Sequence, residues 1–162
     1  PYAVLGYSLG ALVAFELIRA AARAGGPTPR HFFACAAASP QVPRHATGLA
    51  RLPDADFVHA VAARYGGIPA EVLADRGLLE LVLPTLRADI ALLEAWRFVP
   101  GDPLPCPITA YAGRDDQTLP PDALDGWAAY ASGGFDAQRF PGGHFLHRES
   151  PERFAERLLA HL

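Results

Sequence analysis

The sequence has little of what membrane-spanning, disulfide-rich or nucleic-acid-binding proteins need. No apolar run reaches the roughly 18 residues of a membrane-spanning helix. The net charge of −3 provides no strongly basic surface for nucleic acid or anionic lipid. The chain has two cysteines, Cys35 and Cys106, which are too few for a disulfide framework. Both lie in apolar, strand-like segments, and we expect buried thiols in a reducing cytoplasm.

Methionine and lysine are missing altogether. The fourteen basic residues are all arginine, which fits a GC-rich coding sequence better than any function. The chain opens at Pro1, only a few residues before its strongest motif, and we expect the first strands of the domain to lie outside this sequence. The 162 residues, 51% of them hydrophobic, are enough for one buried core and too few to suggest two domains. Residues 1–162 are thus predicted to be the C-terminal part of a single domain.

Apolar strand-like runs alternate with helical patterns along the chain, which predicts an α/β fold with a mostly parallel sheet. The expected strands are Tyr2–Leu5, His31–Ala38, Ile108–Ala112 and Gln138–Phe140. The expected helices beside them are Ala11–Arg23, Asp122–Ala131 and a final helix that Ser150 would cap, with Pro151 and Glu152 in its first turn.

Between the second and third expected strands, residues from about 54 to 95 show helical periodicity over a longer stretch than one crossover connection needs. Asp54 is the expected N-cap of the first of these helices, and a second begins near Pro69. Apolar residues recur at steps of three and four on the first and third helices: Phe57, Val58, Val61 and Tyr65, then Leu83, Leu86, Ile90 and Leu93. We expect this segment to be a helical lid inserted into the sheet.

The motif Gly6-Tyr7-Ser8-Leu9-Gly10 matches G-x-S-x-G, the nucleophile elbow. It follows an apolar strand and opens a helix, which is the context that such an elbow requires. A tight turn exposes the serine hydroxyl, and we expect a Cβ at either glycine to clash with neighbouring backbone. Ser8 is therefore the predicted nucleophile. The Leu9 N–H, at the helix N-terminus, is the predicted oxyanion donor.

A serine nucleophile needs a base, and six histidines are available. His144 follows Pro141-Gly142-Gly143 after a strand, where a loop can carry an imidazole over the elbow, and it is the predicted base. His147, three residues later, is its rival. The others are expected to be solvated or packing residues: His31, His45, His59 and His161.

The base in turn needs a carboxylate, which in α/β-hydrolases lies between the serine and the histidine at the end of a strand. Asp116 ends the turn after Ile108–Ala112 and is the predicted acid. Asp115 is its neighbour, and spacing alone does not separate the two. Asp122 and Asp125 look helical and solvated. The strand His31–Ala38 is followed by Ser39-Pro40, so the other position at which this fold carries its acid has none.

These residues together resemble type II, or editing, thioesterases of nonribosomal peptide and polyketide assembly lines. The resemblance runs from Tyr2 to the final helix, and four segments carry it: Gly6–Ala11, Leu83–Asp89, Gly113–Asp116 and Phe140–Phe145. It implies an α/β-hydrolase fold and a triad of Ser8, Asp116 and His144. It also implies hydrolysis of acyl groups from the phosphopantetheine arm of acyl or peptidyl carrier proteins. No metal or diffusible cofactor is expected, and we expect a monomer.

The chain also departs from this family. Tyr7 stands where members often have histidine, Ser39-Pro40 stands where they often have Ala-Pro, and nothing here supplies their N-terminal part with the second oxyanion donor. Because carrier proteins are usually acidic, Arg87 and Arg97 beside the third lid helix are the arginines we expect to steer docking.

Two other functions fit parts of the sequence. A product-releasing terminal thioesterase or a generic carboxylesterase would share the elbow, but the releasing type more often carries its acid after the earlier strand. A hydrolase relic that acts as a binding module would not need Ser8, Asp116 and His144 intact and in order.

Overall fold

The computed structural model describes residues 1–44 and 47–161. The chain forms two compact units, one of Pro1–Val42 with Phe98–Leu162 and the other of Pro43–Arg97. His45, expected to be a loop histidine, lies outside the described residues.

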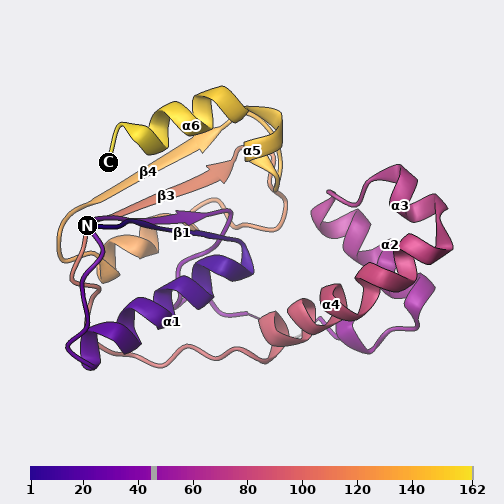
Figure 1. Cartoon of the computed structure of the whole chain (residues 1–162), viewed down its shortest axis with the longest axis horizontal. Coiled ribbons are helices and arrows are strands. Elements are labelled where there is room, and N and C mark those ends of the chain that lie inside the picture. Colours follow the sequence, from indigo (N-terminus) through magenta and orange to yellow (C-terminus); the bar gives the residue numbers. More distant parts are fainter. Residues whose placement is uncertain (45–46, 162) are drawn as a thin grey trace. The chain divides into compact units, whose positions relative to one another are not determined.

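The first unit is built on a four-stranded parallel sheet in the order β1-β2-β3-β4 (Figure 1). The strands are β1 (Val4–Tyr7), β2 (Phe32–Cys35), β3 (Ile108–Gly113) and β4 (Phe135–Phe140). The predicted α/β fold with a parallel sheet is therefore confirmed. The bounds of three strands differ from those expected: β1 lies two residues later, β4 begins at Phe135 rather than Gln138, and β2 is limited to Phe32–Cys35 where His31–Ala38 was expected.

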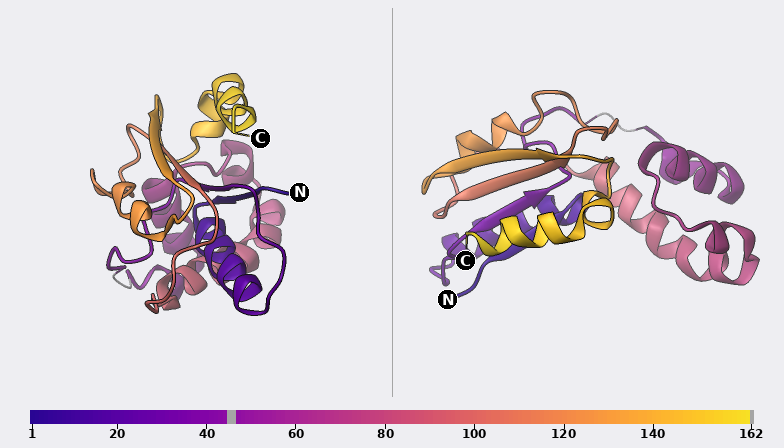
Figure 2. Two further views of the ribbon diagram at one scale, coloured as in Figure 1. Left: turned by 90° about the vertical axis from the view of Figure 1, so that its left-hand side faces the viewer. Right: turned by 90° about the horizontal axis from the view of Figure 1, so that it is seen from above.

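Helices cover both faces of this sheet, as Figure 2 shows. They are α1 (Leu9–Arg23), η2 (Asp125–Tyr130), α5 (Leu146–Glu149) and α6 (Pro151–Leu159). The helix expected over Asp122–Ala131 is present but shorter, and it is a 3₁₀ helix whose backbone hydrogen bonds run from the N–H of residue i+3 to the carbonyl of residue i. Ser150 precedes α6 as expected, but its side chain makes no capping hydrogen bond. The short helix α5 was not predicted.

Alternate residues of β2 belong to opposite faces of the sheet. Phe32 and Ala34 pack into the cluster that contains residues of α1 and η2, whereas Phe33 and Cys35 pack into the cluster that includes Phe154 of α6. This is the two-residue period of a strand with both faces buried, and it explains why β2 reads as a continuous apolar run.

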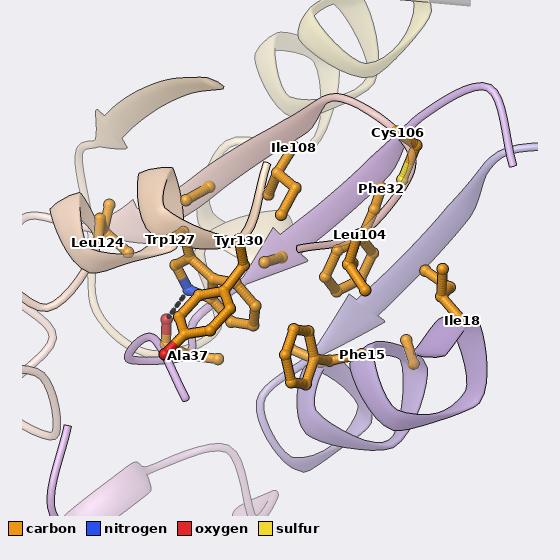
Figure 3. Packing of buried hydrophobic residues seen from close by; sticks show 14 of the residues in the cluster. Phe15, Ile18, Phe32, Ala37, Leu104, Cys106, Ile108, Leu124, Trp127 and Tyr130 are labelled. Carbon is orange, nitrogen blue, oxygen red and sulfur yellow. Dashed lines mark hydrogen bonds between the residues drawn. The ribbon is translucent and has the colours of Figure 1, made fainter. Parts of the chain in front are cut away.

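Aromatic rings fill the core between the sheet and α1 (Figure 3). Trp127 lies edge-on to both Phe15 and Phe32, with ring centroids 5.7 Å apart in each pair. Its indole N–H donates a 3.1 Å hydrogen bond to the Ala37 carbonyl, so the buried ring leaves no unpaired donor.

The two cysteines, Cys35 and Cys106, are free thiols, and both are buried. Burial raises the pKa of the Cys106 thiol to about 11.

The second unit is helical and contains η1 (Leu49–Arg51), α2 (Asp54–Tyr65), α3 (Ala70–Ala74) and α4 (Arg76–Ala95). Its core combines the predicted face of α2 with Ile90 of α4. Asp54 is the first residue of α2 rather than its N-cap, which is Pro53. The unpredicted cap is Asp75, which accepts a hydrogen bond from the Leu78 N–H at 3.0 Å. None of the described helices has the length and apolarity to cross a bilayer.

Arg87 of α4 is half-buried and binds other elements of this helical unit. Its guanidinium donates to the carbonyls of Ala50 and Leu52 at 2.6 and 2.9 Å and pairs with Asp54 at 2.7 Å. It also lies 4.2 Å from the centre of the Phe57 ring. These contacts hold η1 and α2 against α4, and the expectation that Arg87 steers docking stays a prediction.

Candidate active site

Ser8 occupies the single residue between the end of β1 and the start of α1. Its backbone has φ 53° and ψ −117°, a conformation that costs energy in any residue with a Cβ. Hydrogen bonds hold it in place: the Ser8 N–H donates to the Cys35 carbonyl at 2.8 Å, and the Ala11 N–H donates to the Ser8 carbonyl at 3.0 Å. A strained serine that its neighbours fix so firmly is a candidate for function.

The two glycines of the elbow have different roles. A Cβ on Gly6 would lie 2.4 Å from the Gly10 carbonyl oxygen and 2.5 Å from the Ala11 Cα, closer than backbone atoms allow. A Cβ on Gly10 would meet nothing within 4 Å. The expectation of a clash therefore holds for Gly6 and is wrong for Gly10, because α1 begins by turning back over Gly6 while Gly10 faces open space.

The imidazole of His144 lies between Ser8 and Asp116. Its Nε2 is 3.0 Å from the Ser8 Oγ, and its Nδ1 is 2.8 Å from Oδ2 of Asp116. His144 and Asp116 are both buried. His147 does not reach this chain of bonds: its ring lies edge-on to Tyr7, and its buried Nδ1 has no hydrogen-bond partner among the described residues. Of the two histidines that the sequence left open, the structure brings His144 to the serine.

Asp116 also differs clearly from Asp115. Asp115 is exposed, and its backbone N–H donates to the Gly142 carbonyl at 2.9 Å. Burial by itself would raise the pKa of Asp116, but hydrogen bonds from His144 and Thr118 and the charge of His144 outweigh it and hold that pKa below its ordinary value. The carboxylate is thus kept ionised beside the imidazole.

Thr118 is a residue that the sequence reasoning missed. Its N–H and hydroxyl donate to Oδ1 of Asp116 at 2.9 and 2.6 Å, which leaves Oδ2 for the imidazole. The signal was present, because an aspartate that bonds the backbone two residues later is the common Asx turn. Thr118 fixes the direction of the carboxylate and therefore that of the His144 ring.

The loop that carries His144 packs tightly on the end of β3. A Cβ on Gly113 would lie 2.1 Å from the Gly143 carbonyl oxygen, so only glycine fits beside the loop. Gly142 has φ 105°, and the Gly143 N–H donates to the Glu149 carboxylate at 3.0 Å. Glu149, on the unpredicted helix α5, is a second residue of the site that the sequence did not indicate.

The Leu9 N–H is suited to receive a developing negative charge. Leu9 is the first residue of α1, so its N–H has no acceptor within the helix, and it lies at the positive end of the helix dipole. The 3.0 Å contact allows a proton to pass from the Ser8 hydroxyl to His144. No group of three or more described His, Cys, Asp or Glu side chains could hold a metal ion.

Known proteins and solved structures are similar to this chain over most of its length. The chain is 33% identical over 156 residues to the gramicidin S biosynthesis protein GrsT of Aneurinibacillus migulanus, covering 96% of this chain and 60% of GrsT. It is 36% identical over 151 residues to the AMB antimetabolite synthetase AmbE of Pseudomonas aeruginosa, covering 90% of this chain and 7% of AmbE. Its structure matches that of the type II thioesterase BorB from the borrelidin biosynthetic cluster with a TM-score of 0.85 and 30% identity, covering 100% of this chain and 62% of BorB.

The chain therefore spans about 60% of the length of relatives such as GrsT and BorB. The sequence profile of the thioesterase domain family matches residues 1–162, the whole of it. This protein chain belongs to the thioesterase domain family.

Proposed function

We propose that this chain forms the catalytic part of a serine thioesterase that removes acyl groups from the phosphopantetheine arm of acyl or peptidyl carrier proteins. The observation that carries the proposal is the unbroken series of hydrogen bonds from Ser8 through His144 to Asp116, in a chain that belongs to the thioesterase domain family. Its role would be editing, the release of stalled intermediates of an assembly line.

The chemistry follows from the positions of these groups. The Ser8 oxygen attacks the thioester carbonyl carbon while His144 Nε2 takes its proton, and the Leu9 N–H stabilises the oxyanion. The C–S bond then breaks, the carrier thiol leaves with the proton from His144, and an acyl-serine ester remains. Water, deprotonated by the same imidazole, hydrolyses this ester and restores the Ser8 hydroxyl. Asp116 holds the imidazole in the required tautomer and balances its positive charge.

Editing is favoured over product release by the position of the acid. The candidate acid Asp116 follows β3, whereas Ser39 occupies the region after β2, where product-releasing enzymes more often carry their acid. BorB, described as a type II thioesterase, supports the same choice. Product release stays the second candidate, because AmbE is a synthetase many times longer than the segment this chain matches.

We also propose that the complete enzyme has a larger sheet than the one described. β1 lies at one end of the strand order, and the side chains of Leu5, Val13 and Leu17 on β1 and α1 are exposed. Further strands and a helix at this edge would bury those side chains and bring the second oxyanion donor. The helical unit Pro43–Arg97, inserted between β2 and β3, would act as the lid of a monomeric, cytoplasmic enzyme.

The test compares two donors of the same acyl group. With purified enzyme, kcat/KM is measured for acetyl- or propionyl-carrier protein and for acetyl- or propionyl-coenzyme A, with Ser8→Ala as the inactive control. We expect the carrier-bound donor to be preferred, because binding energy from the carrier body adds to transition-state stabilisation. Equal values would remove the carrier-protein assignment. Turnover of neither donor, with no labelling of Ser8 by a fluorophosphonate, would leave a binding module.

Mature full-length product on the carrier is the third substrate to include. Preference for the short acyl groups over this product supports editing. The opposite preference would assign product release instead.

A further inference from the structure

Tyr7 immediately precedes Ser8 in the chain, and its side chain contacts His144, the hydrogen-bond partner of Ser8. Its hydroxyl donates a 2.5 Å hydrogen bond to the backbone carbonyl of His144. Its ring lies edge-on to the His144 and His147 rings, with centroid distances of 6.2 and 4.7 Å, and stacks against Phe145 at 6.4 Å. Tyr7 therefore contacts both the backbone and the ring of the histidine that faces Ser8.

The hydroxyl of Tyr7 is a permanent donor. Burial raises the pKa of this phenol well above its ordinary value, and the nearby Cys35 adds to the effect. The phenol stays protonated throughout the pH range in which a hydrolase works, so the bond to the His144 carbonyl does not titrate away. The Tyr7 hydroxyl therefore holds the His144 backbone by a hydrogen bond that does not depend on pH.

The loop before His144 needs such an attachment. It consists of Pro141, Gly142 and Gly143, and glycine loses more conformational freedom on folding than any other residue. Two hydrogen bonds hold the loop at Gly142 and Gly143: the Asp115 N–H donates to the Gly142 carbonyl, and the Gly143 N–H donates to Glu149. The Tyr7 hydroxyl holds it one residue further on, at His144 itself.

We propose that Tyr7 is a positioning residue that fixes the distance between His144 and Ser8. Tyr7 and Ser8 are consecutive, so the backbone of the base is tied to the backbone of the nucleophile through one side chain. His144 is bound at two points: its Nε2 contacts the Ser8 Oγ, and its backbone carbonyl accepts the bond from the Tyr7 hydroxyl. Because Tyr7 and Ser8 are adjacent, these two contacts link the elbow to the loop that carries His144. This inference rests on the proposed role of Ser8 and His144, and it adds a residue that supports their alignment.

Positioning makes a kinetic prediction that a purely structural role does not. Proton transfer from Ser8 to His144 depends on the distance between the two atoms, and loss of alignment lowers the rate of the chemical step. Tyr7→Phe keeps the ring and removes only the hydroxyl. We expect kcat to fall about tenfold with KM unchanged, and the rate of Ser8 labelling by a fluorophosphonate to fall by the same factor.

The structure provides a matched control in Tyr111. Its ring is buried, and its hydroxyl also donates to a backbone carbonyl, that of Arg157 in α6, at 3.1 Å. Tyr111→Phe therefore removes a bond of the same kind that does not involve His144. Both variants are expected to lose a similar, small amount of stability, while Tyr111→Phe keeps wild-type kcat and labelling rate. Urea unfolding of the same samples gives the folded fraction to which each labelling rate is referred.

The results for Tyr7→Phe and Tyr111→Phe either support or overturn the positioning role of Tyr7. Equal kcat and labelling rates in Tyr7→Phe and Tyr111→Phe would overturn the positioning role, as would a raised KM with unchanged kcat, which would make Tyr7 a substrate contact. Failure of the unmodified enzyme to label at Ser8 would reject the proposed nucleophile itself, a result distinct from failure of the Tyr7 inference. A tenfold loss confined to Tyr7→Phe would support it.

Discussion

Replacing Gly6 by alanine tests whether the elbow geometry makes Ser8 reactive. The added Cβ would lie 2.4, 2.5 and 2.7 Å from the Gly10 oxygen, the Ala11 Cα and the Ala11 nitrogen, whereas ordinary contact begins at 3.4 Å. All three atoms are backbone, so relief requires α1 to retreat from β1 by about 0.7 to 1 Å. Overpacking of this kind typically costs about 1–3 kcal/mol.

The same displacement moves Ser8, which joins the two elements. A misplacement of about 1 Å at reacting groups can lower the rate about 10²-fold, so we expect labelling of Ser8 by a fluorophosphonate to slow about 10²-fold in Gly6→Ala. Stability is followed by urea unfolding on the same sample.

Gly10→Ala is the control, because its Cβ meets nothing within 4 Å and Gly10 lies within α1. Alanine is favoured over glycine in a helix by up to about 1 kcal/mol, so this variant is expected to be as stable as the wild type or slightly more so. It should also label at nearly the wild-type rate. If Gly6→Ala matched Gly10→Ala in both measurements, the argument that the elbow depends on backbone contact at Gly6 would be refuted.

Three further predictions concern buried groups. Asp116→Asn should lower kcat by about 10⁴, since the imidazole loses its tautomer and its counter-charge, while Asp115→Asn should change little; the reverse ranking would move the acid by one residue. Because the folded state lowers the pKa of Asp116, its ionised form contributes stability above the ordinary aspartate pKa of about 3.9, and this contribution is lost as pH falls below it. Urea unfolding should then show a smaller loss of stability between about pH 5 and pH 3 in Asp116→Asn than in the wild type, and equal losses would contradict this. Burial raises the pKa of the Cys35 and Cys106 thiols, so neither should react with a thiol reagent at about pH 8 until the protein is unfolded. Rapid reaction of the folded protein would show that the core around them opens.

Local signals in the sequence predicted the order of the strands along the chain and the position of the elbow, but not every strand boundary. Apolar runs such as that around Phe32 predict strands because a parallel strand buries both faces, and the chain order of strands and helices leaves a parallel sheet as the natural arrangement. The G-x-S-x-G motif predicts the strained turn at Ser8 because so few backbones present a serine between a strand and a helix. These features depend on residues close together in the chain.

Other features were decided only by the tertiary structure, because they depend on contacts between segments that lie far apart in the chain. His144 and His147 are three residues apart, and they separate only because the loop is bound to β3 and α5, which directs one ring to Ser8 and the other to Tyr7. Arg87 was predicted to be a surface charge, and only the fold shows that its guanidinium donates to the carbonyls of Ala50 and Leu52. The sequence by itself determined which residue types carry the chemistry. The packing of elements that lie far apart in the chain decided which copies of those residues meet, because a hydrogen bond selects atoms within about 3 Å of each other and chain spacing carries no such information.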